Sequence, residues 1–165
     1  MAKSRSKAGR NKGQRSKKDG AEEEPLRLGP LADFIGFHLR LAQEASFQAF
    51  ARRVRNYQMR PGRFAVLALI GENPGISQTA LSRAAGRDKS TLTPALNDLV
   101  RRALVTRRRV ASDRRSYALS LTAKGERLLQ ELTLHARAHD RMLDEIVGLR
   151  HKAEFLRALR RLALV

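Results

Sequence analysis

The stretch from residue 77 to 121 constrains the fold most, because two short helical patterns are followed at once by a pair of β patterns. Ser77 can cap the first short helix, Gly86 ends it, and Asp88 can cap the second, which extends to about Arg102. A stripe of apolar residues marks the buried face of this second helix: Leu92, Leu96 and Leu99. Two short helices joined by a tight turn are typical of a helix-turn-helix.

A small β-hairpin is predicted directly after these helices. Leu104–Val110 is typical of a strand, Ala111–Arg115 of a charged turn, and Ser116–Leu121 of a returning strand with alternating apolar residues. Arginines are concentrated around its turn: Arg107, Arg108, Arg109, Arg114 and Arg115. A short basic hairpin beside a helix-turn-helix predicts a wing that reaches into a nucleic-acid groove.

Longer helical patterns lie on both sides of this segment. A long helix from Leu31 carries two apolar stripes, which predict burial on more than one side, and Pro61 suits the start of a second helix. Thr122 can cap another long helix, Gly148 interrupts it, and a last helix ends near Leu162. The predicted fold is mainly α with a small β-hairpin wing, a winged helix-turn-helix.

The charge of the chain favours a polyanionic partner, because 34 Lys and Arg against 16 Asp and Glu give a net charge of +18. Eight of the first 20 residues are Lys or Arg, and Met1 is the only large apolar residue among them. Residues 1–24 are therefore expected to form a disordered basic arm before a domain of residues 25–165. Such an arm either attaches non-specifically to DNA or is a solvated extension without function.

Several classes of function are excluded or disfavoured by what the composition lacks. The absence of Cys excludes disulfides, thiolate metal sites and thiol-based sensing or catalysis. No apolar stretch approaches the roughly 20 residues of a membrane span, and the basic start lacks the apolar middle of a signal peptide. We therefore expect a cytoplasmic protein that is not an enzyme, uses no cofactor or metal, and binds no membrane.

Candidate DNA contacts gather on the two short helices and the wing, where hydroxyl, amide and basic side chains suit phosphates and base edges. On the helices they are Ser77, Gln78, Thr79, Arg87, Lys89, Ser90, Thr91 and Thr93, and on the wing Arg107, Arg109, Asp113, Arg114 and Arg115. Arginine in a narrow minor groove would favour A·T-rich flanks, and an aspartate there is expected to hold a neighbouring arginine. The alternative is a solvent-facing capped helix followed by a solvated charged turn.

Three segments, at residues 73–81, 88–99 and 112–125, make the chain similar to the multiple-antibiotic-resistance regulator (MarR) family over about residues 31–162. The resemblance places the family's minor-groove arginine on Arg115, its bracing carboxylate on Asp113 and a phosphate contact on Arg114. It also implies a homodimer on double-stranded DNA with a near-palindromic operator. The winged helix-turn-helix would span about 61–121, and the dimerisation helices about 29–56 and 122–163. The surplus of apolar surface on those helices agrees with a partner.

The resemblance further implies a repressor that a small aromatic or anionic effector releases from DNA. The candidate effector-binding residues are His38, Arg40, Arg63 and Phe64. A core or interface role is the simpler interpretation of His38, and a core role that of Phe64. Residues 37–43 are similar to regulators of aromatic-acid catabolism that respond to aryl-CoA thioesters, so an aromatic acid or its CoA thioester is the candidate effector.

Two other interpretations stand beside a specific regulator. His135 and His139 are four residues apart on a helix and could bind zinc, but Ala136 stands where a metalloprotease helix needs Glu and the sequence offers no third ligand. Packing at the dimer interface is the favoured role of both histidines. The main alternative function is a sequence-tolerant architectural DNA-binding protein without an effector, since the charge and the arm could coat DNA.

Overall fold

The computed structural model describes residues 26–110 and 113–164, with the backbone alone for Val110 and residues 113–116. The chain divides into two compact units, Met1–Phe34 and Ile35–Val165. The first unit holds a 3-10 helix, η1 (Gly29–Asp33), which has Pro30 in its first turn and ends where Phe34 becomes extended. The predicted basic arm, residues 1–24, lies outside the described residues.

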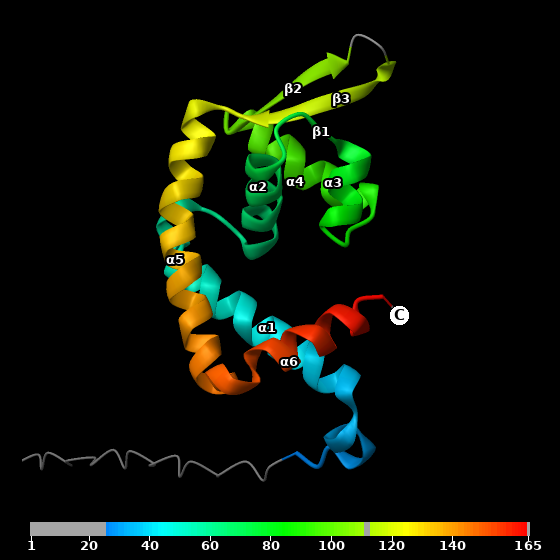
Figure 1. Cartoon of the computed structure of the whole chain (residues 1–165), viewed down its shortest axis with the longest axis vertical. Coiled ribbons are helices and arrows are strands. Elements are labelled where there is room, and N and C mark those ends of the chain that lie inside the picture. The colour runs from blue at the N-terminus through cyan, green and yellow to red at the C-terminus, as the bar shows by residue number, and fades with distance from the viewer. Residues whose placement is uncertain (1–25, 111–112, 165) are drawn as a thin grey trace, which may run out of the picture. The chain divides into compact units, whose positions relative to one another are not determined.

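The second unit is mainly α with one small sheet (Figure 1). Its elements are α1 (Ile35–Arg53), η2 (Arg55–Tyr57), α2 (Pro61–Glu72), β1 (Ile76–Ser77), α3 (Gln78–Ala84), α4 (Lys89–Arg101), β2 (Val105–Val110), β3 (Asp113–Leu121), α5 (Ala123–Val147) and α6 (Leu149–Leu162). This confirms the predicted fold class, with two short helices followed by a β-hairpin. We call α2 to β3 the winged part, and α1, α5 and α6 the platform helices.

The sequence signals for helix ends are confirmed in three caps. Ser77 Oγ accepts a hydrogen bond from the backbone N–H of Ala80 at 3.2 Å, and Thr122 Oγ1 accepts one from Gly125 at 3.0 Å. Asp88 caps α4 in the same way. Gly148, at φ +80°, separates α5 from α6, a backbone conformation that glycine adopts without strain.

The hairpin differs from its predicted boundaries in two respects. β3 begins at Asp113 rather than Ser116, because its backbone pairs with β2 from Val110↔Asp113 onward. The two-residue strand β1 adds a third strand, in the order β1-β3-β2, through the pair Ile76↔Leu119. A strand of two residues is too short to produce an alternating pattern, so β1 could not be predicted from periodicity.

The core lies in the winged part and extends to the ends of the platform helices that contact it. The predicted leucine face of α4 is confirmed, since Leu92, Leu96 and Leu99 have no exposed surface. They pack with fully buried residues of the neighbouring elements: Val54, Val66, Leu67, Ile70, Leu81, Leu119 and Leu132. Within the described residues, no helix is long and apolar enough to cross a membrane.

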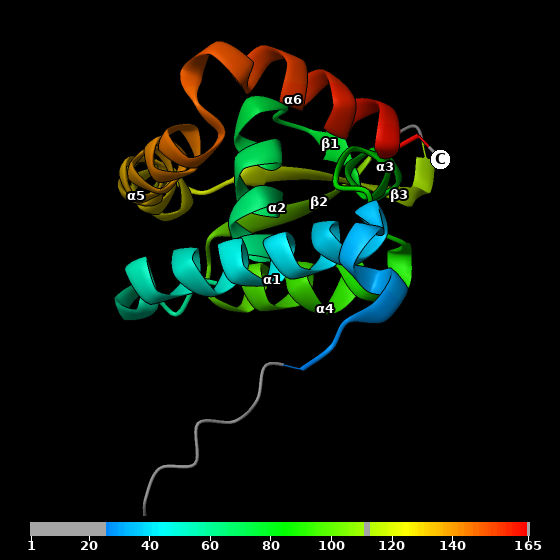
Figure 2. The same cartoon turned by 90° about the horizontal axis from the view of Figure 1, so that it is seen from below.

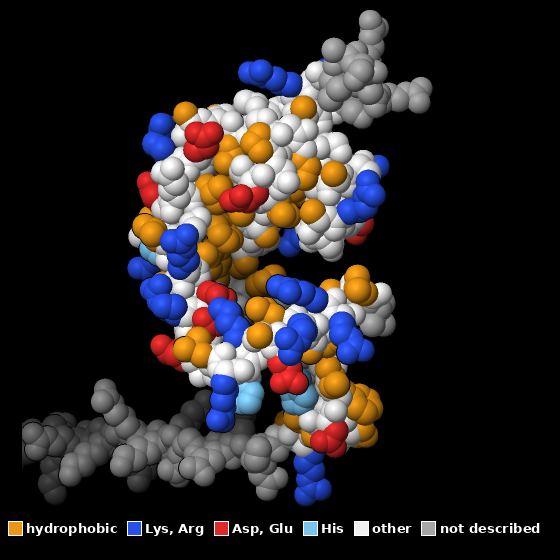
Figure 3. Space-filling model, viewed as in Figure 1, with side chains coloured by type: hydrophobic (Ala, Val, Ile, Leu, Met, Phe, Trp, Pro, Cys, Tyr) orange, Lys and Arg blue, Asp and Glu red, His pale blue; other side chains and the backbone are white. Residues whose placement is uncertain are grey.

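The platform helices leave much of their apolar surface exposed, so the predicted burial of the first helix on more than one side is wrong for a single chain. α1 begins at Ile35, which is 67% exposed, and it buries only Phe50. Ile146 and Leu149 are 76% and 77% exposed, and α6 has no buried residue. Hydrophobic side chains are visible among the cations on this surface (Figure 3).

An apolar groove of about 840 Å³ runs between the platform helices. Its apolar lining includes Leu39 and Ala42 of α1, Ile146 of α5, and Phe155 and Leu159 of α6. Figure 2 shows α1 and α6 extending from α5 on either side of α2. Lys152 fixes α6 to α5 through ion pairs with two aspartates of α5, at 3.1 Å to Asp140 and 2.7 Å to Asp144.

Candidate DNA-binding surface and effector cavity

The start of α4 is organised by the carboxylate of Asp88. Asp88 Oδ1 accepts hydrogen bonds from Ser90 Oγ at 2.6 Å and from the backbone N–H of Thr91 at 2.7 Å, and Thr91 Oγ1 donates to Oδ2 at 3.2 Å. These donors, Ser90 first among them, lower the pKa of Asp88 to about 2. Two of the predicted DNA-binding hydroxyls are therefore held at the exposed N-terminus of the helix.

A second network joins α3, α4 and β2 through Gln78. Its amide Nε2 donates to Thr93 Oγ1 at 2.9 Å, and its Oε1 accepts from Arg107 Nη2 at 3.4 Å. Thr93 Oγ1 in turn donates to the backbone oxygen of Lys89 at 2.6 Å. The guanidinium of Arg107 also lies 5.4 Å from the centre of the Tyr117 ring, a cation–π contact. The structure thus brings Gln78, Thr93 and Arg107 together as one polar cluster.

The other predicted DNA contacts have different surroundings. Thr79 and Lys89 are exposed at the starts of α3 and α4, and Arg109 is exposed on β2. The guanidinium of Arg87 lies instead against Gly62 in the first turn of α2, where it occupies the space that a Cβ on residue 62 would need. The side chains of three wing residues lie outside the described residues: Asp113, Arg114 and Arg115.

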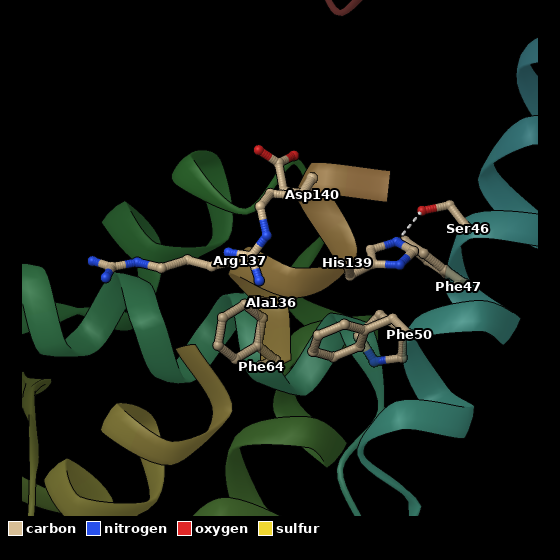
Figure 4. Close-up of a pocket in the computed structure, with 10 residues that line it drawn as sticks. Ser46, Phe47, Phe50, Phe64, Ala136, Arg137, His139 and Asp140 are labelled. Carbon is tan, nitrogen blue, oxygen red and sulfur yellow. Dashed lines mark hydrogen bonds between the residues drawn. The ribbon is translucent and has the colours of Figure 1, made fainter. Parts of the chain in front are cut away.

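An aromatic cavity of about 600 Å³ lies between α1, α2 and α5. Phe47 and Phe50 of α1, Phe64 of α2 and His139 of α5 line it, and Phe50 and Phe64 contact each other with ring centres 5.3 Å apart. Three charged residues of α5 complete the lining: Arg137, Asp140 and Arg141. Figure 4 shows the aromatic rings grouped on one side, with the Asp140 carboxylate pointing away from them. The cavity can accommodate a planar apolar group with a polar substituent.

His139 is the buried polar group of this cavity, with only 7% of its surface exposed. Its Nε2 shares a hydrogen bond with Ser46 Oγ at 3.0 Å, whereas its buried Nδ1 has no hydrogen-bond partner among the described residues (Figure 4). Burial lowers the pKa of His139 below 6.5, and the charge of Arg53 lowers it further. The imidazole is therefore held in its neutral form.

Both histidines make ring contacts within this chain, His139 as a buried and His135 as a half-buried residue, and their predicted role at a dimer interface stays a prediction. The His139 ring meets the edge of Phe50 at 5.8 Å, and His135 lies 5.5 Å from the ring of Tyr57. Among the described residues, no group of three or more acidic, His or Cys side chains could hold a metal ion.

The four predicted effector-binding residues do not line a single cavity. Phe64 lines the aromatic cavity, Arg63 lines a second cavity beside it, and Arg40 lines the apolar groove. His38 lines none of these three, and its ring contacts Phe37 at 5.6 Å. Sequence reasoning missed Ser46 and His139 as a pair because they are 93 residues apart, and no local spacing connects them.

Comparison with known proteins identifies the class of protein that this fold and surface define. Residues 57–116 match the model of the MarR family. The chain is also 34% identical over 131 residues to a putative transcriptional regulatory protein for the hcr operon of Thauera aromatica, covering 73% of this chain and 79% of that one. The chain therefore belongs to the MarR family and is a transcription regulator of that type.

Two solved structures of the transcriptional repressor CouR are similar in both fold and sequence. CouR bound to a 23-mer DNA duplex is 33% identical with a TM-score of 0.78, covering 85% of this chain and 99% of that one. CouR bound to p-coumaroyl-CoA is 30% identical with a TM-score of 0.76, covering 84% and 98%. The likeness includes the platform helices as well as the winged part, since nearly all of each CouR chain is covered.

Proposed function

We propose that this protein is a repressor that binds a near-palindromic operator as a homodimer and is released by an aromatic acid or its CoA thioester. The observation that carries the proposal is the position of the aromatic cavity, which lies where two platform helices meet α2. An effector there contacts both the helices that would hold a partner and the helix that leads into the winged part. Effector binding can therefore change how the two recognition helices are presented to DNA.

The polar surface of the winged part supports the DNA-binding step. The N-terminus of α4 presents Lys89, Ser90 and Thr91 to solvent, beside the exposed Thr79 of α3. Gln78 ties α3 and α4 to the wing, so helix and wing are fixed relative to each other before DNA arrives. Such preorganisation reduces the entropy lost on binding. In this proposal Arg107 is mainly a brace, whereas Arg109, Arg114 and Arg115 contact DNA.

The exposed apolar face of the platform helices supports the dimer. A second copy on the apolar groove would cover Ile146 and Phe155, which are 76% and 45% exposed in one chain. Two recognition helices related by two-fold symmetry would then meet half-sites roughly 34–36 Å apart, about one turn of DNA. The DNA-bound and p-coumaroyl-CoA-bound forms of CouR make DNA and an aromatic thioester the partners to test first.

The proposal is tested by binding the full-length protein to the DNA upstream of its own gene and to a shuffled duplex at physiological salt. We expect the upstream DNA to bind about 10³-fold or more tightly than the shuffled duplex. We further expect benzoate, p-coumarate or one of their CoA thioesters to abolish that preference.

Equal affinity for the two duplexes would refute the specific repressor and favour the architectural protein. Specific binding that none of these compounds relieves would refute the effector class while leaving the regulator intact. Phe64→Ala, which opens the aromatic cavity, should reduce the response to the effector, and Phe37→Ala, on α1 outside the lining of that cavity, serves as its control.

A further inference from the structure

A second cavity, which we call the arginine groove, lies beside the aromatic cavity and has no role in the proposal above. It is about 500 Å³ and is bordered by α1, the first turn of α2, and α4. Three guanidinium groups line it: Arg60, Arg63 and Arg87. One carboxylate, that of Glu44, lines it as well, and this group already accepts a hydrogen bond from Gln48 at 2.8 Å. The lining therefore carries a net positive charge.

The position of Arg87 in this groove is fixed by its contacts with neighbouring residues. Its guanidinium lies over Gly62, a position that a side chain on residue 62 would fill. Its backbone is fixed by two hydrogen bonds with Ser82, whose carbonyl oxygen accepts from the Arg87 N–H at 3.0 Å and whose hydroxyl donates to the Arg87 oxygen. The first-turn residues Pro61 and Gly62 of α2 line the groove, and this helix has no side-chain cap, so its positive end adds to the positive charge there.

The arginine groove and the aromatic cavity adjoin each other. Phe47 of α1 and Pro61 of α2 line both of them. A molecule with its aromatic end against Phe50 and Phe64 would pass these two shared residues and extend its other end toward the arginines. A free aromatic acid is too short to occupy both cavities, whereas a CoA thioester carries phosphates at a distance from its acyl group.

We propose that the arginine groove binds the phosphate groups of the effector, so that the effector is an acyl-CoA thioester rather than the free acid. Guanidinium groups bind phosphate oxygens through charge-assisted, frequently bidentate hydrogen bonds, and three of them converge on this groove. The inference rests on the proposed effector response and specifies the chemistry of its ligand.

The same arginines connect the groove to the recognition helix. Arg63 Nη1 lies 3.4 Å from Asp98 Oδ2 of α4, and Asp98 is only 11% exposed. A phosphate in the groove competes with Asp98 for Arg63. Arg87 directly precedes Asp88, the cap of α4, so a phosphate that draws its guanidinium acts on the turn between α3 and α4. Phosphate binding thus acts on two contacts of α2, one with Asp98 in the last turns of α4 and one with Arg87 just before α4 begins.

The test measures ligand binding by calorimetry with the full chain and no DNA, using p-coumaroyl-CoA, CoA and p-coumarate as probes. We expect Arg60→Ala and Arg87→Ala each to weaken binding of both CoA-containing probes by about 10-fold to 100-fold, because each loses a charged hydrogen bond. Binding of p-coumarate should change less than about twofold, because the free acid occupies the aromatic cavity and does not extend into the arginine groove. Arg127→Ala, on the exposed surface of α5, is the matched control and should leave all three unchanged.

Gly62→Ala provides an independent variant that keeps every charge. The added Cβ displaces the Arg87 guanidinium, whose flexible end can move, so the fold is retained while the groove is altered. We expect weaker binding of CoA and p-coumaroyl-CoA together with an unchanged melting temperature. Circular dichroism on each variant establishes that the fold is intact.

Three outcomes would overturn the inference. If wild-type protein binds neither CoA nor its thioester, or if the arginine variants bind both as wild type does, the groove does not hold effector phosphates. If Arg87→Ala instead weakens operator binding and leaves CoA binding intact, the groove belongs to DNA phosphates. Operator selectivity and its relief by a free aromatic acid are measured separately, so the proposed repressor can stand when this inference fails.

Discussion

In the winged part, Leu81, Leu92 and Leu96 have no exposed surface, whereas in the platform helices Ile146 and Leu149 leave about three quarters of theirs exposed. Both regions are helical and similarly rich in leucine. The difference is that α2, α3, α4 and the sheet enclose one another, while α1 and α6 lack an element on their outer face. One region thus buries its apolar face within a single chain, whereas the other leaves an apolar face exposed, which the proposed second copy would cover.

This difference separates two kinds of stability. Substitutions in the winged part should act on folding within one chain and be independent of protein concentration. Substitutions on the outer face of the platform helices should act on association and appear only in concentration-dependent measurements. Paired substitutions, one in each region, therefore test whether the two kinds of stability are separate.

The largest effect is expected in the core of the winged part. Leu96→Ala removes a fully buried side chain from α4, so it should lower the free energy of unfolding by about 2–5 kcal/mol. Urea denaturation at two protein concentrations measures it. Val100→Ala on the exposed face of the same helix should cost less than about 0.5 kcal/mol. A loss for Leu96→Ala that grows on dilution would mean that the winged part also depends on the partner.

The platform helices should show a smaller effect, on association rather than folding. Ile146→Ala removes apolar surface that a second copy would cover. Burial of one such side chain is worth about 1.5–3 kcal/mol, so the dissociation constant of the dimer should rise. Sedimentation equilibrium measures the dissociation constant. Leu134→Ala, which alters a 65% exposed leucine away from the apolar groove, is the matched control. Equal weakening by both would show that the partner covers another face of α5.

A still smaller effect should follow from loosening the link between helix and wing. Gln78→Ala removes the hydrogen bonds to Thr93 and from Arg107, each worth about 1 kcal/mol, and should weaken operator binding by at most their sum. Fluorescence anisotropy with operator and shuffled duplex measures the change. Thr79→Ala, on the exposed start of α3, separates a direct DNA contact from the loss of the brace. If Gln78→Ala leaves operator affinity unchanged, the cluster has no part in DNA binding.

The smallest effect is expected for the loss of folding stability as the pH falls. His139 has a folded-state pKa below its unfolded value of 6.5, so above pH 6.5 both states are neutral and no stability is lost. As the pH falls below 6.5 the unfolded imidazole gains its proton first, and stability declines until the folded pKa is passed. Asp88 follows at lower pH, losing its contribution as the pH falls from about 3.8 through about 2. Thermal melts between pH 7.5 and 5 should show less decline in His139→Gln than in wild type, and parallel curves would contradict this.

The helices and the hairpin of the winged part could be predicted from the sequence because the signals for them are local. Each of the three capping side chains accepts a hydrogen bond from the N–H group three residues further along the chain. The leucines of α4 are likewise spaced along a single helix. The exposure of α1 could not be predicted in the same way, because an apolar stripe is the same whether the chain or a second copy covers it. The resemblance to the MarR family implies a second copy on this face, which the periodicity of apolar residues alone could not indicate.

The cavities were less predictable because they depend on contacts between distant segments. Of the residues proposed for the effector, Phe64 and Arg63 line cavities on either side of Phe47 and Pro61, whereas His38 and Arg40 lie elsewhere. Arg87 was predicted to contact DNA because it precedes the cap of α4. Its contact with Gly62, 25 residues earlier, follows only from how α2 packs beside the turn.

The two tyrosines have a practical consequence, because the chain contains no tryptophan to mask their emission. Tyr117 lies under Arg107 on the wing, and Tyr57 lies against His135 between the platform helices and α2. One natural fluorophore therefore lies on the wing, and the other lies in η2 beside α5. In Tyr57→Phe the remaining emission reports on the wing as DNA is added, and in Tyr117→Phe it reports on the region near the aromatic cavity as the effector is added. The arrival of DNA and of the effector can then be timed separately in unlabelled protein.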